Sequence, residues 1–159
     1  MHVVLVEPEI APNTGNIARL CAATNTTLDL IEPFGFKLDD TQLKRAGMDY
    51  WHFLEWHRWT TWDVFINQVP AGAPLWFIES KGQRRYTEVQ FGDQDYLVFG
   101  RETAGLPGKL LEANRDRWVR IPMFNPNARS LNLANCVSLV LFEALRQLGF
   151  PNELPPGCP

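Results

Sequence analysis

The sequence predicts an α/β domain built on a mostly parallel β-sheet with helices on its faces. Short apolar runs such as Val3–Val6 and Leu75–Ile78 are typical of strands buried on both faces. These runs alternate with segments at helical spacing, and polar, turn-rich loops separate them. The length of 159 residues suits one domain with a sizeable core, so we expect residues 1–150 to form that domain and residues 151–159 a short proline-rich tail.

The first half of the chain is predicted to alternate strands with helices. Strands are expected where apolar residues run together or alternate, and helices where they recur every three or four residues near a capping side chain. The expected strands are Val3–Val6, Leu28–Ile31 and Tyr50–Leu54. The expected helices are Ile17–Ala23, a segment opened by Asp39 and Asp40 that runs through Lys44 and Ala46, and Trp62–Gln68 capped by Thr60 or Thr61.

The second half continues the pattern and ends in the clearest helix. Strands are expected at Leu75–Ile78, at Tyr96–Phe99, and from Trp118 through Val119 to Ile121, with a short helix at Lys109–Ala113. Ser130 or Asn132 can cap a final helix that Gly149 and Pro151 end. That helix repeats apolar side chains at three- and four-residue spacing, the mark of one buried face, at Leu133, Val137, Val140, Leu141, Ala144 and Leu148.

Composition limits the classes of protein that fit. No apolar run approaches the roughly 18 residues that a membrane span needs, and the N-terminus is typical of a first strand rather than a signal peptide, so we expect a cytoplasmic protein. The three cysteines, Cys21, Cys136 and Cys158, lack metal-ligand spacing and are interpreted as reduced thiols. A formal net charge of -3 disfavours a broad basic footprint for nucleic acid. Any RNA would be held by local patches or by two subunits together.

Two conspicuous segments have competing interpretations. The tryptophan-rich stretch Tyr50–Trp62 is explained by core packing and subunit contact more simply than by stacking on bases. Lys81, Arg84 and Arg85 form a small basic cluster on a predicted turn. That cluster could contact tRNA phosphates, and a solvated turn explains it equally well.

Four polar loops follow predicted strands at one edge of the sheet, where parallel α/β sheets bind ligands. They are Glu7–Asn16, Glu79–Arg85, Gly100–Pro107 and Pro122–Leu131, and they hold most of the asparagine, glycine and mid-chain proline residues. Neither a G-x-G-x-x-G fingerprint nor a Walker phosphate loop is present. The three histidines fall outside these loops and no G-x-S-x-G surrounds Ser130, which disfavours zinc enzymes and serine hydrolases. What remains is a pocket for a small organic cofactor, with Arg19, Arg101, Glu102 and Arg129 nearby.

Three motifs at these residues resemble the SPOUT class of RNA 2'-O-methyltransferases, and within it the bacterial subfamily that modifies the wobble pyrimidine of tRNA. They are EPEIAPNTGNIARLCAAT (Glu7–Thr24), YLVFGRETAGLP (Tyr96–Pro107) and IPMFNPNARSLNLANCVSLVLFEALRQLG (Ile121–Gly149). The resemblance extends from Val3 to about Phe150. Two departures are a loop at Phe124–Ala128 that is one residue longer than expected, and Phe142 where relatives often have tyrosine.

The resemblance implies a deep trefoil knot, in which the segment after Ile121 threads through a preceding loop, and an obligate homodimer with its interface beside the cofactor. It also implies that S-adenosylmethionine binds in the knot loops and is converted to S-adenosylhomocysteine. The implied cofactor contacts are Ile78, Gly100, Ile121 and Ser130, with Met123 and Leu131 as neighbours. Arg19 corresponds to the catalytic arginine, and the same site would be lined by Asn16, Glu102, Ser130 and Asn132.

The mechanism that fits these residues is an in-line methyl transfer to a ribose 2'-oxygen of tRNA, in which positioning supplies much of the rate. Because arginine is a poor base, we favour Arg19 binding an adjacent phosphate and orienting the hydroxyl, with the proton passing to phosphate, to water or to a strongly perturbed Arg19. Glu102 either balances charge or bonds backbone N–H groups. The alternatives are a methyltransferase acting on another RNA, such as rRNA, and a non-catalytic dimer that binds RNA or a nucleoside.

Overall fold

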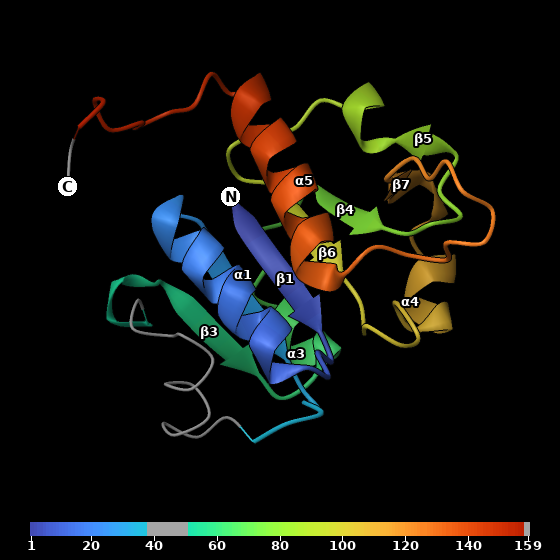
Figure 1. The fold of residues 1–159 in the computed structure, drawn as a ribbon. Helices are drawn as coiled ribbons and strands as arrows, with labels where there is room; N and C mark the ends of the chain where they lie inside the picture. Colours follow the sequence, from blue (N-terminus) through green and yellow to red (C-terminus); the bar gives the residue numbers. More distant parts are fainter. Residues whose placement is uncertain (38–50, 158–159) are drawn as a thin grey trace.

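The structure of the protein is a computed structural model, which describes residues 1–37 and 51–157. Those residues form seven strands in the order β3-β2-β1-β6-β4-β7-β5, and all pair in parallel, as the sequence predicts (Figure 1). The strands are β1 (His2–Val6), β2 (Thr27–Ile31), β3 (Trp56–Trp59), β4 (Leu75–Ile78), β5 (Arg84–Arg85), β6 (Tyr96–Phe99) and β7 (Trp118–Arg120).

Helices cover both faces of the sheet, and the sheet separates two apolar cores. Helices α1 (Ala11–Ala23) and α5 (Leu133–Gln147) lie side by side on one face, where Val3 and Leu5 of β1 are buried against them (Figure 1). On the other face Val4 and Val6 pack with Phe65 of α3 (Trp62–Ile66), next to α4 (Gly108–Glu112). Short 3-10 segments are η1 (Trp51–Phe53), η2 (Tyr86–Glu88) and η3 (Arg115–Arg117).

Helix α1 starts earlier than expected and α3 ends earlier. α1 begins at Ala11 rather than Ile17, because Pro12 is tolerated in the first turn, where its missing N–H has no partner to lose. The predicted loop after β1 therefore shortens to residues 7–10. In α3 the Thr61 hydroxyl accepts a hydrogen bond from the Val64 N–H at 3.2 Å, so Thr61 is the cap.

The two edge strands differ from the prediction. The strand expected at Tyr50–Leu54 is wrong, since the described part of it holds the 3-10 turn η1, and the strand lies instead at β3, paired with β2. β5 falls inside a segment predicted as a turn and pairs with β7. Edge strands keep much of their side-chain surface in water, so the alternation that marks a half-buried strand is weak here. The helix predicted to open at Asp39 and Asp40 lies outside the described residues.

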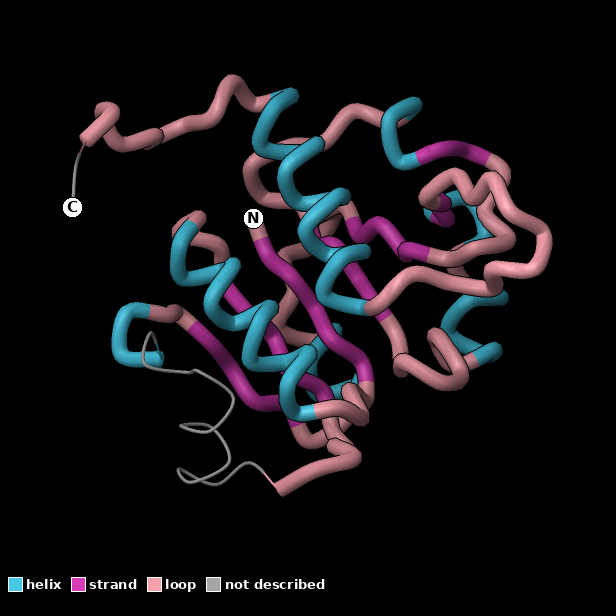
Figure 2. Tube along the Cα trace, viewed as in Figure 1, coloured by secondary structure: helices cyan, strands magenta, loops and turns pink. Residues whose placement is uncertain are grey.

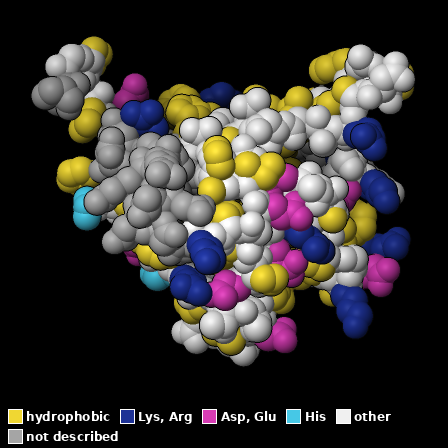
Figure 3. All heavy atoms as spheres, turned by 60° about the horizontal axis from the view of Figure 1, so that its bottom comes forward, with side chains coloured by type: hydrophobic (Ala, Val, Ile, Leu, Met, Phe, Trp, Pro, Cys, Tyr) yellow, Lys and Arg dark blue, Asp and Glu magenta, His cyan; other side chains and the backbone are white. Residues whose placement is uncertain are grey.

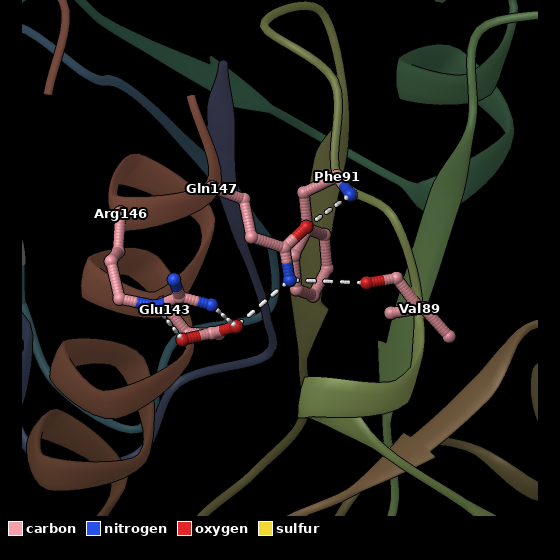
Figure 4. Close-up of polar contacts among 5 residues, drawn as sticks. All are labelled: Val89, Phe91, Glu143, Arg146 and Gln147. Carbon is pink, nitrogen blue, oxygen red and sulfur yellow. Dashed lines mark hydrogen bonds and ion pairs between the residues drawn. The ribbon is translucent and has the colours of Figure 1, made fainter. Parts of the chain in front are cut away.

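The C-terminal half of α5 is anchored to the segment that precedes β6 (Figure 4). The Gln147 side-chain oxygen accepts from the Phe91 N–H at 2.9 Å, while its amide group donates to the Val89 carbonyl at 3.1 Å and to Glu143 at 2.9 Å. Arg146 donates to both carboxylate oxygens of Glu143, and these bonds lower the pKa of that carboxyl group. This anchor holds the axis of α5, and therefore the position of its N-terminus.

The remaining sequence-based expectations for the fold concern the cysteines, the tryptophans and the tail. Cys21 and Cys136 are free thiols, and burial raises the pKa of both. Trp59 and Trp62 pack against Phe65, as core packing predicts. Residues 151–157 are exposed and run away from the sheet (Figure 1). Among the described helices, none has the length and apolarity that a membrane span requires.

Candidate functional site

The loops after β1, β4, β6 and β7 meet at one edge of the sheet. The four strands are consecutive neighbours in the order β1-β6-β4-β7 and run in the same direction, so their carboxyl ends are side by side. The loops that leave them comprise residues 7–10, 79–83, 100–107 and 121–132 (Figure 2). The prediction that these four segments converge is confirmed, and parallel pairing is the reason.

A cavity of about 360 Å³ lies among these loops and the N-terminus of α5. Its size falls in the range of small-molecule sites, which is roughly 300–1,000 Å³. Its walls include all six predicted cofactor contacts, namely Ile78, Gly100, Ile121, Met123, Ser130 and Leu131. They also include Glu102 and Asn132 from the predicted catalytic set, together with Arg101 and Arg129.

Two predicted catalytic residues lie elsewhere in the single chain. Asn16 and Arg19 are exposed on the surface of α1 and do not line the cavity. The reason is local, because α1 has already begun at Ala11 and its turning carries these side chains away from the loops. Any role for Arg19 at the cavity therefore depends on what covers that surface of α1.

A continuous set of side-chain hydrogen bonds, which we name the interloop bridge, connects Glu102, Asn13 and Asn132. The Glu102 carboxylate accepts from the Asn13 amide group at 3.0 Å. Asn13 in turn accepts from the Asn132 amide group at 2.9 Å. The Asn132 oxygen caps α5 by accepting from the backbone N–H of Ala134 at 2.9 Å, so Asn132 and not Ser130 is the cap. The bridge thus connects three segments that form or border the cavity.

A second set of bonds holds the loops after β1 and β6 together in both directions. Glu102 accepts from the backbone N–H groups of Glu9 at 2.8 Å and Ile10 at 3.2 Å. Glu9 accepts from the hydroxyl and the backbone N–H of Thr103, and these bonds lower the pKa of the Glu9 carboxyl group. Of the two interpretations of Glu102, the one in which it bonds backbone N–H groups is met, but these groups belong to the loop after β1 and not, as expected, to its own loop.

Asn13 is the site residue that sequence reasoning missed. It is buried, it lines the cavity, and both ends of its amide are used by the interloop bridge. A signal was available, since Asn13 lies in the same asparagine-rich run as Asn16. Only the early start of α1 turns Asn13 inward and Asn16 outward.

Gly100 allows the loop after β6 to fold back on itself. A Cβ atom at this position would lie 2.2 Å from the backbone carbon of Gly105 and 2.3 Å from the backbone nitrogen of Leu106. Arg101 and Gly105 exchange backbone hydrogen bonds of 3.0 and 3.1 Å that close the loop. The absence of a side chain at Gly100 therefore lets this loop close tightly, and both Gly100 and Gly105 line the cavity.

The cavity combines apolar walls with a few polar groups. Ile78, Ile121 and Leu133 supply apolar surface. Glu79 supplies a carboxylate and Ser80 a hydroxyl, and the Arg101 Nε is buried with no hydrogen-bond partner among the described residues. Such a lining suits an organic ligand with an apolar ring and charged or polar ends.

In the part of the chain that the structure describes, no group of three or more His, Cys, Asp or Glu residues is placed to hold a metal ion.

Comparison with known proteins gives a consistent result. The model of the SpoU rRNA Methylase family matches residues 1–142. A tRNA (cytidine(34)-2'-O)-methyltransferase from Saccharophagus degradans is 53% identical over 152 residues, which cover 94% of this chain and 96% of that protein. A structure described as giving "structural insights into the 2-OH methylation of C/U34 on tRNA" matches with a TM-score of 0.88 and 42% identity, covering 93% and 95% of the two chains.

A more distant structure contains a ligand. The SpoU methyltransferase AviRb from Streptomyces viridochromogenes, in complex with the cofactor AdoMet, matches with a TM-score of 0.80 and 26% identity. The match covers 93% of this chain and 57% of that one. The likeness therefore extends to the region of this chain that contains the cavity.

The interloop bridge predicts a specific loss of stability. Asn13→Ala removes both hydrogen bonds of a buried amide, so the free energy of unfolding should fall by about 1–3 kcal/mol. Asn16→Ala, on the exposed side of the same helix, should change it by less than about 0.5 kcal/mol. Denaturant unfolding of both variants measures the difference, and equal stabilities would contradict the role of the bridge.

Two glycines provide a second matched comparison. Gly100→Ala forces a Cβ atom into backbone and should lower the free energy of unfolding by at least about 2 kcal/mol. Gly108→Ala meets no atom within 4 Å, so its stability should be unchanged or raised by up to about 1 kcal/mol. Thermal and denaturant unfolding test this pair. A Gly100→Ala protein as stable as Gly108→Ala would show that the loop after β6 can relax.

Proposed function

Because the chain belongs to the SpoU rRNA methylase family, we propose that it is an S-adenosylmethionine-dependent methyltransferase that acts on tRNA. Its product is the 2'-O-methylated ribose of the wobble pyrimidine at position 34, the nucleotide named for the Saccharophagus degradans relative. The observation that carries the proposal is the convergence of all six predicted cofactor positions on one cavity. Such an enzyme works where tRNA is found, in the cytoplasm.

The cavity residues fit S-adenosylmethionine by their chemistry. Ile78, Ile121 and Leu131 offer apolar surface for the adenine ring, and Gly100 contributes backbone to the cavity wall. Glu79 and the half-buried Arg101, whose Nε lies 3.5 Å from a Glu7 carboxylate oxygen, provide charges of both signs for the amino-acid part. When bound, this cofactor supplies a methyl group on a sulfonium centre. Glu102 and Asn13 hold the surrounding loops in place and so position the reactants.

Arg19 is the residue to which we assign the substrate side of the reaction. Its guanidinium would bind the phosphate next to the target ribose and orient the 2'-hydroxyl for in-line attack. The hydroxyl proton then leaves to that phosphate or to water, because an arginine side chain stays protonated near neutral pH. Since Arg19 is exposed on α1 and lies outside the cavity of its own chain, this assignment requires a second subunit.

A homodimer is supported by apolar side chains left exposed around the cavity and along α5. Ile10 and Leu131 at the cavity rim are 43% and 38% exposed. Leu139 and Phe142, on α5, are 42% and 48% exposed. A second copy packed over this strip would bury it and bring its own α1 towards the cavity. Arg19 of one subunit would then act on substrate held by the other, and tRNA would contact both.

The remaining predictions belong to the same proposal. The trefoil knot implied by the family resemblance is consistent with a chain that inserts β6 between β1 and β4 and then β7 between β4 and β5. A ribosomal RNA target is less well supported, because the relative at 53% identity is named for tRNA. A non-catalytic dimer that binds RNA would leave the cavity residues without a use, and one that binds a nucleoside in the cavity would transfer no methyl group to RNA.

Methyl transfer tests the proposed function directly. Wild-type protein given labelled S-adenosylmethionine and bulk tRNA should label RNA, and mass spectrometry of the digested tRNA should place the methyl group on the ribose of nucleotide 34. Arg19→Ala should lower the transfer rate by at least about a hundredfold, while calorimetry should find the cofactor affinity within about twofold of wild type. An Arg19→Ala enzyme of normal rate would refute the role of Arg19.

The homodimer has its own test. Leu139→Asp and Phe142→Asp place charges in an apolar contact, so each should shift the protein from dimer to monomer in analytical ultracentrifugation. Leu154→Asp, in the exposed tail, is the control and should leave the dimer intact. If Arg19 acts across the interface, mixing Arg19→Ala with Gly100→Ala, whose displaced loop should disturb the cavity, should give more activity than either variant alone. Monomeric wild-type protein with full activity would exclude the shared site.

A further inference from the structure

A second hollow, outside the cofactor cavity, collects positive charge on a chain whose net charge is negative. It lies beside β5 and is lined by Trp76, Lys81, Gln83, Arg84, Arg115, Asp116, Arg117 and Trp118, and we name it the basic groove. Four of these residues are cationic and one is anionic, whereas the whole chain carries -3. Figure 3 shows Lys and Arg side chains gathered on the side of the molecule that carries β5, β7 and α4.

The guanidinium groups of the groove are held in place by indole rings. Arg84 and Arg117 both stand over Trp76, each 5.5 Å from the ring centroid. Arg115 stands 5.7 Å from the centroid of Trp118. Trp76 is itself fixed, because it is buried and its indole N–H donates to Asp95 at 2.7 Å. Stacked guanidinium groups keep their N–H edges free for a phosphate and lose little entropy on binding it.

Most of these cations are not neutralised within the described part of the chain. Lys81, Arg84 and Arg115 form no ion pair with a carboxylate there, and only Arg117 pairs with Asp116, at 3.6 Å on the exposed surface. Arg84 donates to the Asp116 backbone carbonyl, which does not cancel its charge. By contrast, Arg85 on the other side of β5 is paired with Glu88 at 3.4 Å. Uncompensated cations in a hollow are suited to an anionic partner.

One loop joins the groove to the cofactor cavity. Glu79 and Ser80 line the cavity, and Lys81 and Gln83, which follow directly, line the groove. Gly82 between them is buried, and a Cβ atom there would lie 3.0 Å from the Val119 backbone, so the loop is pressed against β7. A polyanion in the groove would therefore continue towards the ligand in the cavity.

We propose that the basic groove binds the phosphate backbone of the RNA substrate next to the nucleotide that enters the cavity, an inference that rests on the proposed function. The groove reads charge rather than sequence. Its guanidinium groups already occupy faces of the indoles, so Trp76 and Trp118 support the cations rather than stack on bases. An RNA held this way is bound by a salt-dependent contact that is the same for every base sequence.

The test removes two groove cations, Lys81 and Arg115, that have no ion-pair partner among residues 1–37 and 51–157. Lys81→Ala/Arg115→Ala is compared with Lys37→Ala/Arg58→Ala, which removes one lysine and one arginine from the other side of the sheet, after β2 and in β3. Fluorescence anisotropy measures tRNA binding without cofactor at several salt concentrations. The groove variant should bind about tenfold more weakly. Its plot of log affinity against log salt should be shallower by about 1.5, because each phosphate contact contributes roughly 0.7–0.9 to the slope.

The possible outcomes distinguish a failure of the groove proposal from a failure of the proposed function. Weaker tRNA binding with a shallower salt slope in the groove variant alone, with S-adenosylmethionine affinity unchanged in calorimetry, supports the groove. Equal affinity and slope in the two double variants overturns it, whether or not the wild-type protein transfers methyl groups. If the groove variant unfolds, Lys81→Gln and Arg115→Gln are measured singly, each with an expected slope change of about 0.8. Wild-type protein that binds tRNA through the groove but never methylates it overturns the proposed function alone.

Discussion

The site depends on one physical constraint, the need to hold three separate segments, namely the start of α1, the loop after β6 and the start of α5, against each other without a covalent link. The interloop bridge meets this need with two side-chain bonds, Asn132 to Asn13 at 2.9 Å and Asn13 to Glu102 at 3.0 Å. Asn13 is buried, so its bonds compete little with water and a lost partner would be costly. Glu102 also receives backbone N–H groups ahead of α1, so the carboxylate serves the helix start and the loop after β6 together.

Sheet topology brings these loops within reach of the bridge. Because β6 lies between β1 and β4, the loops after β1 and β6 emerge beside each other, and the loop after β4 is next to them. Helix α5 then crosses above the sheet, anchored at one end by Gln147 and capped at the other by Asn132. Asn132 therefore has two roles. Its side-chain oxygen accepts hydrogen bonds from the first backbone N–H groups of α5, and its side-chain nitrogen donates to Asn13. The position of α5 and the shape of the cavity are coupled through this residue.

Charge is distributed so that two different ligands can be bound by neighbouring surfaces. The cavity is lined mainly by apolar and uncharged groups, together with two carboxylates and two guanidinium groups. The basic groove is cationic, and its arginines are ordered by tryptophans. The net negative charge of the chain disfavours non-specific binding of nucleic acid over its whole surface. The basic groove still attracts phosphate groups locally. The loop of residues 79–83 is shared by both surfaces.

The sequence by itself determined the fold class, the buried strands β1, β4 and β6, and the extent of α5, because each is a local pattern of apolar residues that water drives inward. The four site loops and the six cavity contacts were also predictable, from strand ends and from the family resemblance. Tertiary structure alone decided the rest. The edge strands β3 and β5 exist through pairing with distant strands. The choice of Asn132 over Ser130 as the cap, the inward turn of Asn13 and the outward turn of Arg19 follow from where α1 and α5 begin. Those starting points depend on partners far away in the chain, which no local pattern contains.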